Sequence, residues 1–281
     1  MLDDEMFLRA AYRAYFKREP DEDGLNYYLP ALQRKSMNKL DVLRSFTQSN
    51  EYRQVHNLPI HPLNALHQAR MMLIQHCLPE AEVIVDLGGA STDYTEGALL
   101  GSGYPHKPRE IIIVDLPPEE RMLPSAESFQ EYITSEGIKI TYLYRSMVDL
   151  SPIEDESVDM VFSGESIEHV TEEEGDSVCR EAYRVLKQGG YFCLDTPNAT
   201  LTRLESPHQL IHPEHKIEYH VQELKDKLNR WGFEMLEEKA VCPMPESIAS
   251  GDFSYDEMVQ HIGLSDNAEE GYLFFLKAVK P

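Results

Sequence analysis

The sequence has few cysteines, no long hydrophobic run and no excess of basic residues. Four cysteines occur among 281 residues, and no two of them have C-x-x-C spacing. Such sparse cysteines are typical of reduced thiols in a cytosolic protein rather than of a disulfide scaffold. No segment approaches the roughly 20 apolar residues of a membrane-spanning helix. The acidic start MLDDE also lacks the basic residues of a signal peptide. We therefore predict a cytoplasmic protein without an integral membrane segment.

Positive charge is scarce after residue 58. The chain has 26 Lys and Arg against 49 Asp and Glu, a net charge of −23, whereas residues 1–58 contain nine of each sign. The whole acidic excess therefore lies in the rest of the chain. Such a surface repels phosphate backbones, which argues against nucleic acid as a partner. It is compatible with a neutral or cationic ligand.

Residues 1–58 differ in pattern from the remainder. Apolar and aromatic residues recur at helical spacing over 7–16, from 24 onward and over 40–46, and the two-proline segment HNLPIHPLN at 56–64 follows as a linker. We predict a small all-helical accessory domain over residues 1–58. Its aromatic stripe is either the core of this short domain or an exposed platform for a sugar or a protein partner.

From residue 59 to 281, strand-like apolar runs alternate with amphipathic helices. Strands are predicted over 82–86, 110–115, 138–144, 158–163, 191–195, 233–241 and 272–279, and helices over 63–78, 176–188 and 221–230. This alternation is typical of a mostly parallel sheet with helices on both faces. We predict an α/β, Rossmann-like domain with seven strands, of which the last two pair antiparallel. The insertion 243–270 between them is either a lid or a packed excursion.

Ligands of open α/β sheets bind beyond the carboxyl ends of the strands, so the residues there are the candidates for a site. The first strand leads into Asp86-Leu87-Gly88-Gly89, whose glycines permit a tight turn and a close approach to a ligand. This segment lacks both the G-x-G-x-x-G pattern of nicotinamide binding and a glycine-lysine phosphate loop. The second strand ends in Asp115, which is either a ribose-binding carboxylate or a solvated strand-end residue.

Four segments resemble, in order, the motifs of class I S-adenosylmethionine (SAM)-dependent methyltransferases. They are VIVDLGGAS, IIIVDLP, VDMVFSGESIEHV and RVLKQGGYFCLDTPN. The resemblance covers residues 80–240 and extends to the branch of ubiquinone-type O-methyltransferases. The first motif departs from the family's D-x-G-x-G-x-G, because Ala90 and Thr92 stand where glycines are common.

The resemblance implies SAM as the cofactor and assigns its contacts. The methionine portion is expected next to Asp86, Gly88, Gly89 and Glu165, the ribose hydroxyls at Asp115, and the adenine edge at Ser146 and Met147. The family often has Asp in the place of Ser146, so the backbone of Met147 is the more dependable contact.

A hydroxyl acceptor needs a base, and histidine is tuned to neutral pH. His169 follows the fourth strand and is our candidate catalytic base, with a locally packed helix-start histidine as the alternative. In the ubiquinone-type relatives an E-x-x-E-H arrangement is associated with a divalent metal such as magnesium. Glu165, Glu168 and His169 match this spacing and are therefore candidate metal ligands.

Two further histidines follow the fifth strand. His212 and His215 belong to an HPEH stretch similar to one in many bacterial methyltransferases, and we interpret them as candidate acceptor contacts. The alternative is a solvated surface loop.

The N-terminal segment FLRAAYRAYFKREPDEDGLNYYLPAL resembles a small bacterial helical domain of unknown function. That domain occurs beside enzymes of surface-polysaccharide assembly. We therefore expect a SAM-dependent O-methyltransferase that acts on a hydroxyl of a sugar or glycan in bacterial surface-polysaccharide biosynthesis. One alternative is a small aromatic or quinone-like acceptor. Another is a non-catalytic binding protein that keeps the fold, suggested by the altered glycine loop. The oligomeric state stays open.

Overall fold

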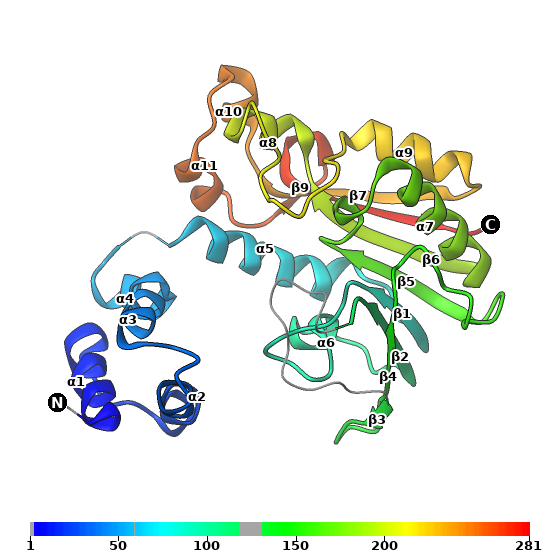
Figure 1. Ribbon diagram of the computed structural model, residues 1–281. Helices are drawn as coiled ribbons and strands as arrows, with labels where there is room; N and C mark the ends of the chain where they lie inside the picture. Colours follow the sequence, from blue (N-terminus) through cyan, green and yellow to red (C-terminus); the bar gives the residue numbers. More distant parts are fainter. Residues whose placement is uncertain (1–2, 59, 118–130) are drawn as a thin grey trace. The chain divides into compact units, whose positions relative to one another are not determined.

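The computed structural model describes residues 3–58, 60–117 and 131–281 (Figure 1). The chain divides into two compact units, Met1–Ala65 and Leu66–Pro281. The division falls within helix α5 (Pro62–Cys77).

The first unit is all-helical, as predicted. It contains α1 (Asp4–Phe16), α2 (Glu22–Gln33), α3 (Lys39–Gln48) and α4 (Asn50–Val55). Each helix follows a short polar residue whose side chain accepts a backbone N–H of the first turn, namely Asp3, Asp21, Asn38 and Ser49. Tyr12 and Phe16 of the aromatic stripe are buried against Phe46, so this part of the stripe forms the core of the unit.

The second unit is built on one mixed sheet. Its strands are β1 (Val83–Leu87), β2 (Glu110–Asp115), β3 (Glu131–Ile133), β4 (Lys139–Tyr144), β5 (Val158–Gly164), β6 (Leu186–Pro197), β7 (Glu234–Pro243), β8 (Leu264–Ser265) and β9 (Gly271–Val279). In the described part of the chain the strand order is β3-β4-β2-β1-β5-β6-β9-β7-β8. The seven predicted strands are all present. Two further strands, β3 and β8, lie at the edges and bring the described sheet to nine strands. They were not predicted, because they are too short to show a periodic pattern in the sequence.

The five central strands are parallel, in the order β4, β2, β1, β5 and β6. β9 then pairs antiparallel with both β6 and β7, which confirms the predicted antiparallel pairing of the last two long strands. The residues between these two strands form α10 (Pro245–Ser250), α11 (Tyr255–Gln260), β8 and the 3-10 turn η3 (Ala268–Glu270).

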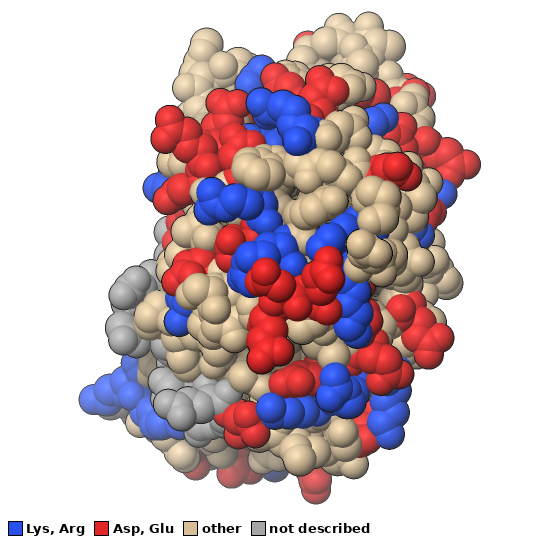
Figure 2. All heavy atoms as spheres, turned by 90° about the vertical axis from the view of Figure 1, so that its right-hand side faces the viewer, with Lys and Arg blue, Asp and Glu red and all other residues tan. Residues whose placement is uncertain are grey.

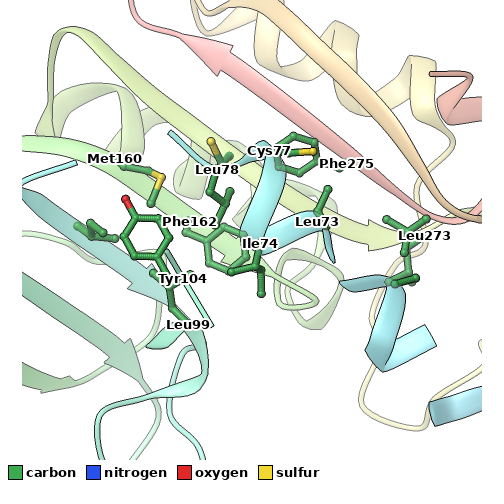
Figure 3. Close-up of a cluster of buried hydrophobic side chains, with 14 of the residues drawn as sticks. Leu73, Ile74, Cys77, Leu78, Leu99, Tyr104, Met160, Phe162, Leu273 and Phe275 are labelled. Atoms are coloured by element: carbon green, nitrogen blue, oxygen red, sulfur yellow. The ribbon is translucent and has the colours of Figure 1, made fainter. Parts of the chain in front are cut away.

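Helices cover both faces of the sheet (Figure 1). The remaining helical elements are α6 (Ala98–Gly101), η2 (Ile167–His169), α7 (Glu172–Val185), α8 (Ala199–Glu205) and α9 (Val221–Arg230). On one face, Leu73 and Ile74 of α5 pack with Phe162 of β5 (Figure 3). On the other face, α7 and α9 pack against the alternate residues of the same strands, such as Val161. Burial on both faces explains the near-continuous apolar runs of β1, β2 and β5.

Helix α7 differs from the helix predicted over 176–188. It begins at Glu172, because Thr171 and Glu174 form a reciprocal capping box. It ends at Val185, since Leu186 already pairs with Val158 of β5. The predicted stop signal Gly189-Gly190 instead lies where the register of β5 and β6 shifts, and Gly189 has a φ of 77° there.

Charged side chains of both signs are interspersed on the face of the molecule shown in Figure 2. Among the described residues, no helix combines the length and the apolar composition that a membrane span requires.

Candidate functional site

The residues predicted to bind a ligand follow four neighbouring strands. Because β4, β2, β1 and β5 are parallel and adjacent, their carboxyl ends meet at one edge of the sheet. The register pairs Leu87 with both Val114 and Ser163, and Asp115 with Tyr144. Along this edge the structure therefore places Ser146 and Met147 after β4, Asp115 at the end of β2, Asp86 to Gly89 at the end of β1, and Glu165 after β5.

The loop after β1 depends on two glycines. Gly88 has a φ of 73°, and its N–H donates to the carbonyl of Val114 at 2.8 Å. A Cβ atom at Gly88 would lie 2.7 Å from the Cβ of Ser166, and one at Gly89 would lie 2.0 Å from a carboxylate oxygen of Asp86. The absence of side chains here leaves bare backbone over the end of β1, which a ligand can approach closely.

Asp86 lies buried beneath this loop. Burial, followed by the negative charge of Asp115, raises the pKa of Asp86 to about 8. Its Oδ2 atom has no hydrogen-bond partner among the described residues. A buried carboxyl oxygen without a partner is costly, so this atom is suited to accept a hydrogen bond from a bound ligand.

Asp115 holds the glycine loop from the neighbouring strand. Its Oδ2 accepts the N–H of Ala90 at 3.0 Å, and its Oδ1 accepts the N–H of Leu116 at 2.7 Å. The Asp115 carbonyl accepts the N–H of Arg145 at 2.8 Å, which ties the turn after β4 to the same place. Met147 in that turn packs partly buried against the core.

An arginine that the sequence analysis missed joins the ends of β5 and β6. The guanidinium of Arg70, from α5, lies 2.8 Å from Glu165 and 2.8 Å from the fully buried Asp195. Burial lowers the pKa of Arg70, but the charges of Asp195 and Glu165 outweigh it and leave the pKa raised. The only local signal was a basic residue within an amphipathic helix. Its partners lie far away in the sequence.

Three of the candidate residues form a second group beside this edge. Glu168, His169 and His215 each offer an atom of the kind that binds metals, and these atoms lie within 4.8 Å of one another. Glu168 is buried; its Oε2 accepts the hydroxyl of Thr196 at 2.8 Å, while its Oε1 has no partner among the described residues. Burial, followed by the charge of Glu165, raises the pKa of Glu168 to about 8. Burial, followed by His215, lowers the pKa of His169.

Backbone hydrogen bonds bring the HPEH stretch to this group. The N–H groups of Lys216 and Ile217 donate to the carbonyl of Glu168 at 2.8 and 3.3 Å. The ring of His215 then lies 5.1 Å from that of His169, and the ring of His212 lies 6.1 Å from it. The predicted acceptor residues and two of the three predicted metal ligands are thus neighbours.

Glu165 has a different position from the one expected for a metal ligand. It pairs with Arg70 and lies outside the group of atoms that could hold an ion, where His215 stands instead. The resulting donor set is one carboxylate and two imidazoles. Carboxylates suit Mg²⁺ and Mn²⁺, and imidazoles suit the transition metals, so the set fits a divalent cation. The unpaired Oε1 of Glu168 supports this fit.

Comparison with protein families matches two parts of the chain. Residues 96–194 match a family model described as a methyltransferase domain, a range that begins after the glycine loop. Residues 1–55 match a domain of unknown function, DUF4214. No curated protein sequence matches the chain.

Solved structures share the fold of the second unit. A SAM-dependent methyltransferase of Thermotoga maritima, described as a possible histamine N-methyltransferase, is 19% identical over 83% of this chain and 95% of its own, with a TM-score of 0.53. A methyltransferase of Haloferax volcanii, in complex with the Trm112 methyltransferase activator, is 19% identical over 77% of this chain and 90% of its own, with a TM-score of 0.51. At 19% identity, the similarity to these two structures shows a shared fold. This fold agrees with the match of residues 96–194 to a methyltransferase domain.

The raised pKa of Asp86 predicts a pH-dependent stability. Between its usual value of 3.8 and about 8, the folded chain keeps a proton that the unfolded chain releases. Rising pH therefore favours unfolding, by about 1 kcal/mol per pH unit. The variant Asp86→Asn does not titrate, so its stability relative to the wild type is expected to increase as pH rises. Urea unfolding followed by circular dichroism at about pH 5, 6 and 7 measures this difference.

The exposed Asp93 in the same loop provides the control. Asp93→Asn is expected to follow the wild-type profile at every pH. Parallel profiles for Asp86→Asn and the wild type would contradict the assignment of a protonated Asp86.

Proposed function

We propose that this SAM-dependent methyltransferase transfers a methyl group to a hydroxyl of a sugar or glycan. The observation that carries the proposal is a sheet edge rich in carboxyl groups directly beside a histidine cluster. Five carboxyl groups lie at or next to this edge, namely those of Asp86, Asp115, Glu165, Glu168 and Asp195. The guanidinium of Arg70 pairs with two of them, Glu165 and Asp195. The charge of Asp115 and the carboxyl oxygens at this edge suit the sulfonium and ammonium groups of SAM. The adjoining histidines provide groups that can take a proton from an acceptor.

We propose that the residues at the edge hold the cofactor in the order that the resemblance implies. In our proposal Asp86, Gly88, Gly89 and Glu165 hold the methionine portion, and Asp115 holds the ribose hydroxyls. Ser146 and Met147 border the adenine. The bare backbone at the two glycines and the unpaired Oδ2 of Asp86 support this assignment. The cofactor supplies a methyl group bonded to a positively charged sulfur, and the protein orients the acceptor toward it.

His169 takes the acceptor proton in the first form of the mechanism. Because burial lowers its pKa, the imidazole is neutral at pH 7 and has a lone pair available. Neither ring nitrogen hydrogen-bonds a protein group in the part of the chain that the structure describes, which leaves the ring available to a substrate. His212 and His215 border the same ring and would contact the acceptor.

A metal-assisted form is supported by the unpaired oxygen of Glu168. In this form Glu168, His169 and His215 hold a divalent cation such as Mg²⁺ or Mn²⁺. The cation would supply Lewis acidity that lowers the pKa of an acceptor hydroxyl. His169 is then a ligand rather than the base, and the ring of His212 lies 6.1 Å from it.

The acceptor class is supported from outside the site. Residues 1–55 match DUF4214. The resemblance of this segment to a helical domain that occurs beside enzymes of surface-polysaccharide assembly implies a glycan acceptor. The acidic composition disfavours nucleic acid and leaves neutral glycans as suitable acceptors. The proposal includes a cytoplasmic location, which the sparse cysteines favour. A small aromatic or quinone-like hydroxyl is the alternative acceptor, as expected of the ubiquinone-type branch.

Binding of S-adenosylhomocysteine tests the cofactor site. We expect calorimetric titration to show binding to the wild type, and Asp115→Ala to weaken it at least tenfold, because the ribose loses both hydrogen-bond acceptors. Glu110→Gln, at the other end of β2, is the matched control and should bind like the wild type. Absence of binding to the wild type would favour the non-catalytic alternative.

Methyl transfer from labelled SAM tests the acceptor class. Incubation with nucleotide-sugar and cell-envelope glycan fractions is expected to label the glycans, with the label stable to mild base as an ether is. Lipid-soluble phenols serve as the comparison. Label found only in the phenols would overturn the glycan proposal and support the quinone-like alternative.

Removal of divalent cations separates the two forms of the mechanism. If Glu168, His169 and His215 hold a cation, dialysis against EDTA should lower turnover about 100-fold or more, and Mg²⁺ or Mn²⁺ should restore it. In either form of the mechanism, His169→Ala should lower turnover at least as much as chelation does, and its affinity for S-adenosylhomocysteine should be unchanged. Full turnover after chelation would leave only the direct-base form. Full turnover of His169→Ala would contradict both the direct-base and the metal-assisted form.

A further inference from the structure

We propose that Glu218 is a positioning residue that orients His215, so that the Nε2 atom of this histidine faces Glu168 and His169. The inference deepens the proposed function and rests on its metal-assisted form. The sequence pattern places Glu218 among the histidines of this segment but assigns it no role of its own. It lies three residues after His215, in the segment that leads to α9.

Glu218 is a buried carboxylate whose two oxygens are both occupied. Its Oε1 accepts the N–H of Ile211 at 2.8 Å and lies 3.0 Å from Nδ1 of His215. Its Oε2 accepts the hydroxyl of Thr202 at 2.5 Å. Only 4% of Glu218 is exposed, so these contacts are shielded from competing water.

These contacts determine which nitrogen of His215 carries the proton. A carboxylate can only accept hydrogen bonds, so Nδ1 of His215 must donate to Glu218. In a neutral imidazole the other nitrogen, Nε2, then has the free lone pair. Pairing of a ligand histidine with a carboxylate in this way fixes the ring and makes the ligating nitrogen more basic.

The other histidine of the HPEH stretch has the opposite arrangement. Nδ1 of His212 accepts the backbone N–H of Glu214 at 3.3 Å, so the proton of its neutral ring resides on Nε2. Its Nε2 is therefore a donor and does not offer a lone pair. This contrast agrees with the geometry. The three possible ligand atoms within 4.8 Å of one another belong to Glu168, His169 and His215, and none belongs to His212.

The first experiment measures Mn²⁺ binding to the whole protein by electron paramagnetic resonance. In Glu218→Gln the amide keeps the shape of the side chain but removes its charge. We expect this variant to bind Mn²⁺ about 10- to 100-fold more weakly than the wild type, with S-adenosylhomocysteine affinity changed less than twofold. Glu257→Gln is the matched control, because Glu257 is also a buried carboxylate that accepts backbone N–H groups, at Glu246 and Ser247. It should bind Mn²⁺ like the wild type.

The second experiment detects the proton itself. Long-range ¹H–¹⁵N spectra of protein labelled at histidine should show His215 protonated on Nδ1 in the wild type. In Glu218→Ala the resonances should move toward the mixture typical of a free imidazole, while Glu218→Asp should recover part of the Nδ1-protonated form. A merely structural role of Glu218 would leave the tautomer unchanged. If Glu218→Ala does not fold, the His215 tautomer is compared between the wild type, Glu218→Gln and Glu218→Asp instead.

The outcomes separate this inference from the proposal on which it rests. Equal Mn²⁺ affinity in the wild type and Glu218→Gln would overturn the positioning role and leave the cation site intact. Absence of Mn²⁺ binding to the wild type would overturn the metal-assisted form and this inference together, while S-adenosylhomocysteine binding would still support the methyltransferase assignment.

Discussion

Parallel pairing of β4, β2, β1, β5 and β6 is the constraint on which the rest of this structure depends. Because adjacent parallel strands point the same way, the turns after them converge on one edge, whatever the length of chain between them. Asp86, Asp115 and Glu165 come from three different strands and share a site only for this reason. The backbone N–H of Gly88 donating to Val114, and that of Ala90 donating to Asp115, lock two of these turns together.

The convergence of these turns also brings carboxyl groups together. Two buried carboxyl groups at this edge, Asp86 and Glu168, have their pKa raised to about 8, and each has one oxygen without a partner among the described residues. Burial raises the pKa of both groups because it penalises their ionised form. A cationic ligand would remove this penalty. Arg70 pairs with Glu165 and Asp195 beside these two groups.

Two histidines of the same short loop have different hydrogen-bond partners. His212 and His215 are three positions apart in the same stretch, yet one accepts a backbone N–H and the other is paired with Glu218. Thr202 and Ile211 also hydrogen-bond the carboxylate of Glu218 and hold it next to His215. A sequence pattern that treats both histidines as acceptor contacts cannot distinguish them, because their protonation depends on these partners.

Local pattern was enough to predict the helical N-terminal region, the seven main strands and the residues at the strand ends. Apolar runs closed by Asp and Gly are local signals, so β2 matched its predicted range and Asp86, Gly88 and Asp115 were found at strand ends. The boundaries of α7 were less accurate, since Leu186 prefers pairing with β5 to a further helical turn. Only the tertiary structure brought Arg70 to Asp195, 125 residues away, and put His215 in the place expected for Glu165. Pairing across such distances depends on where the sheet and helices place each side chain, which the order of residues alone does not specify.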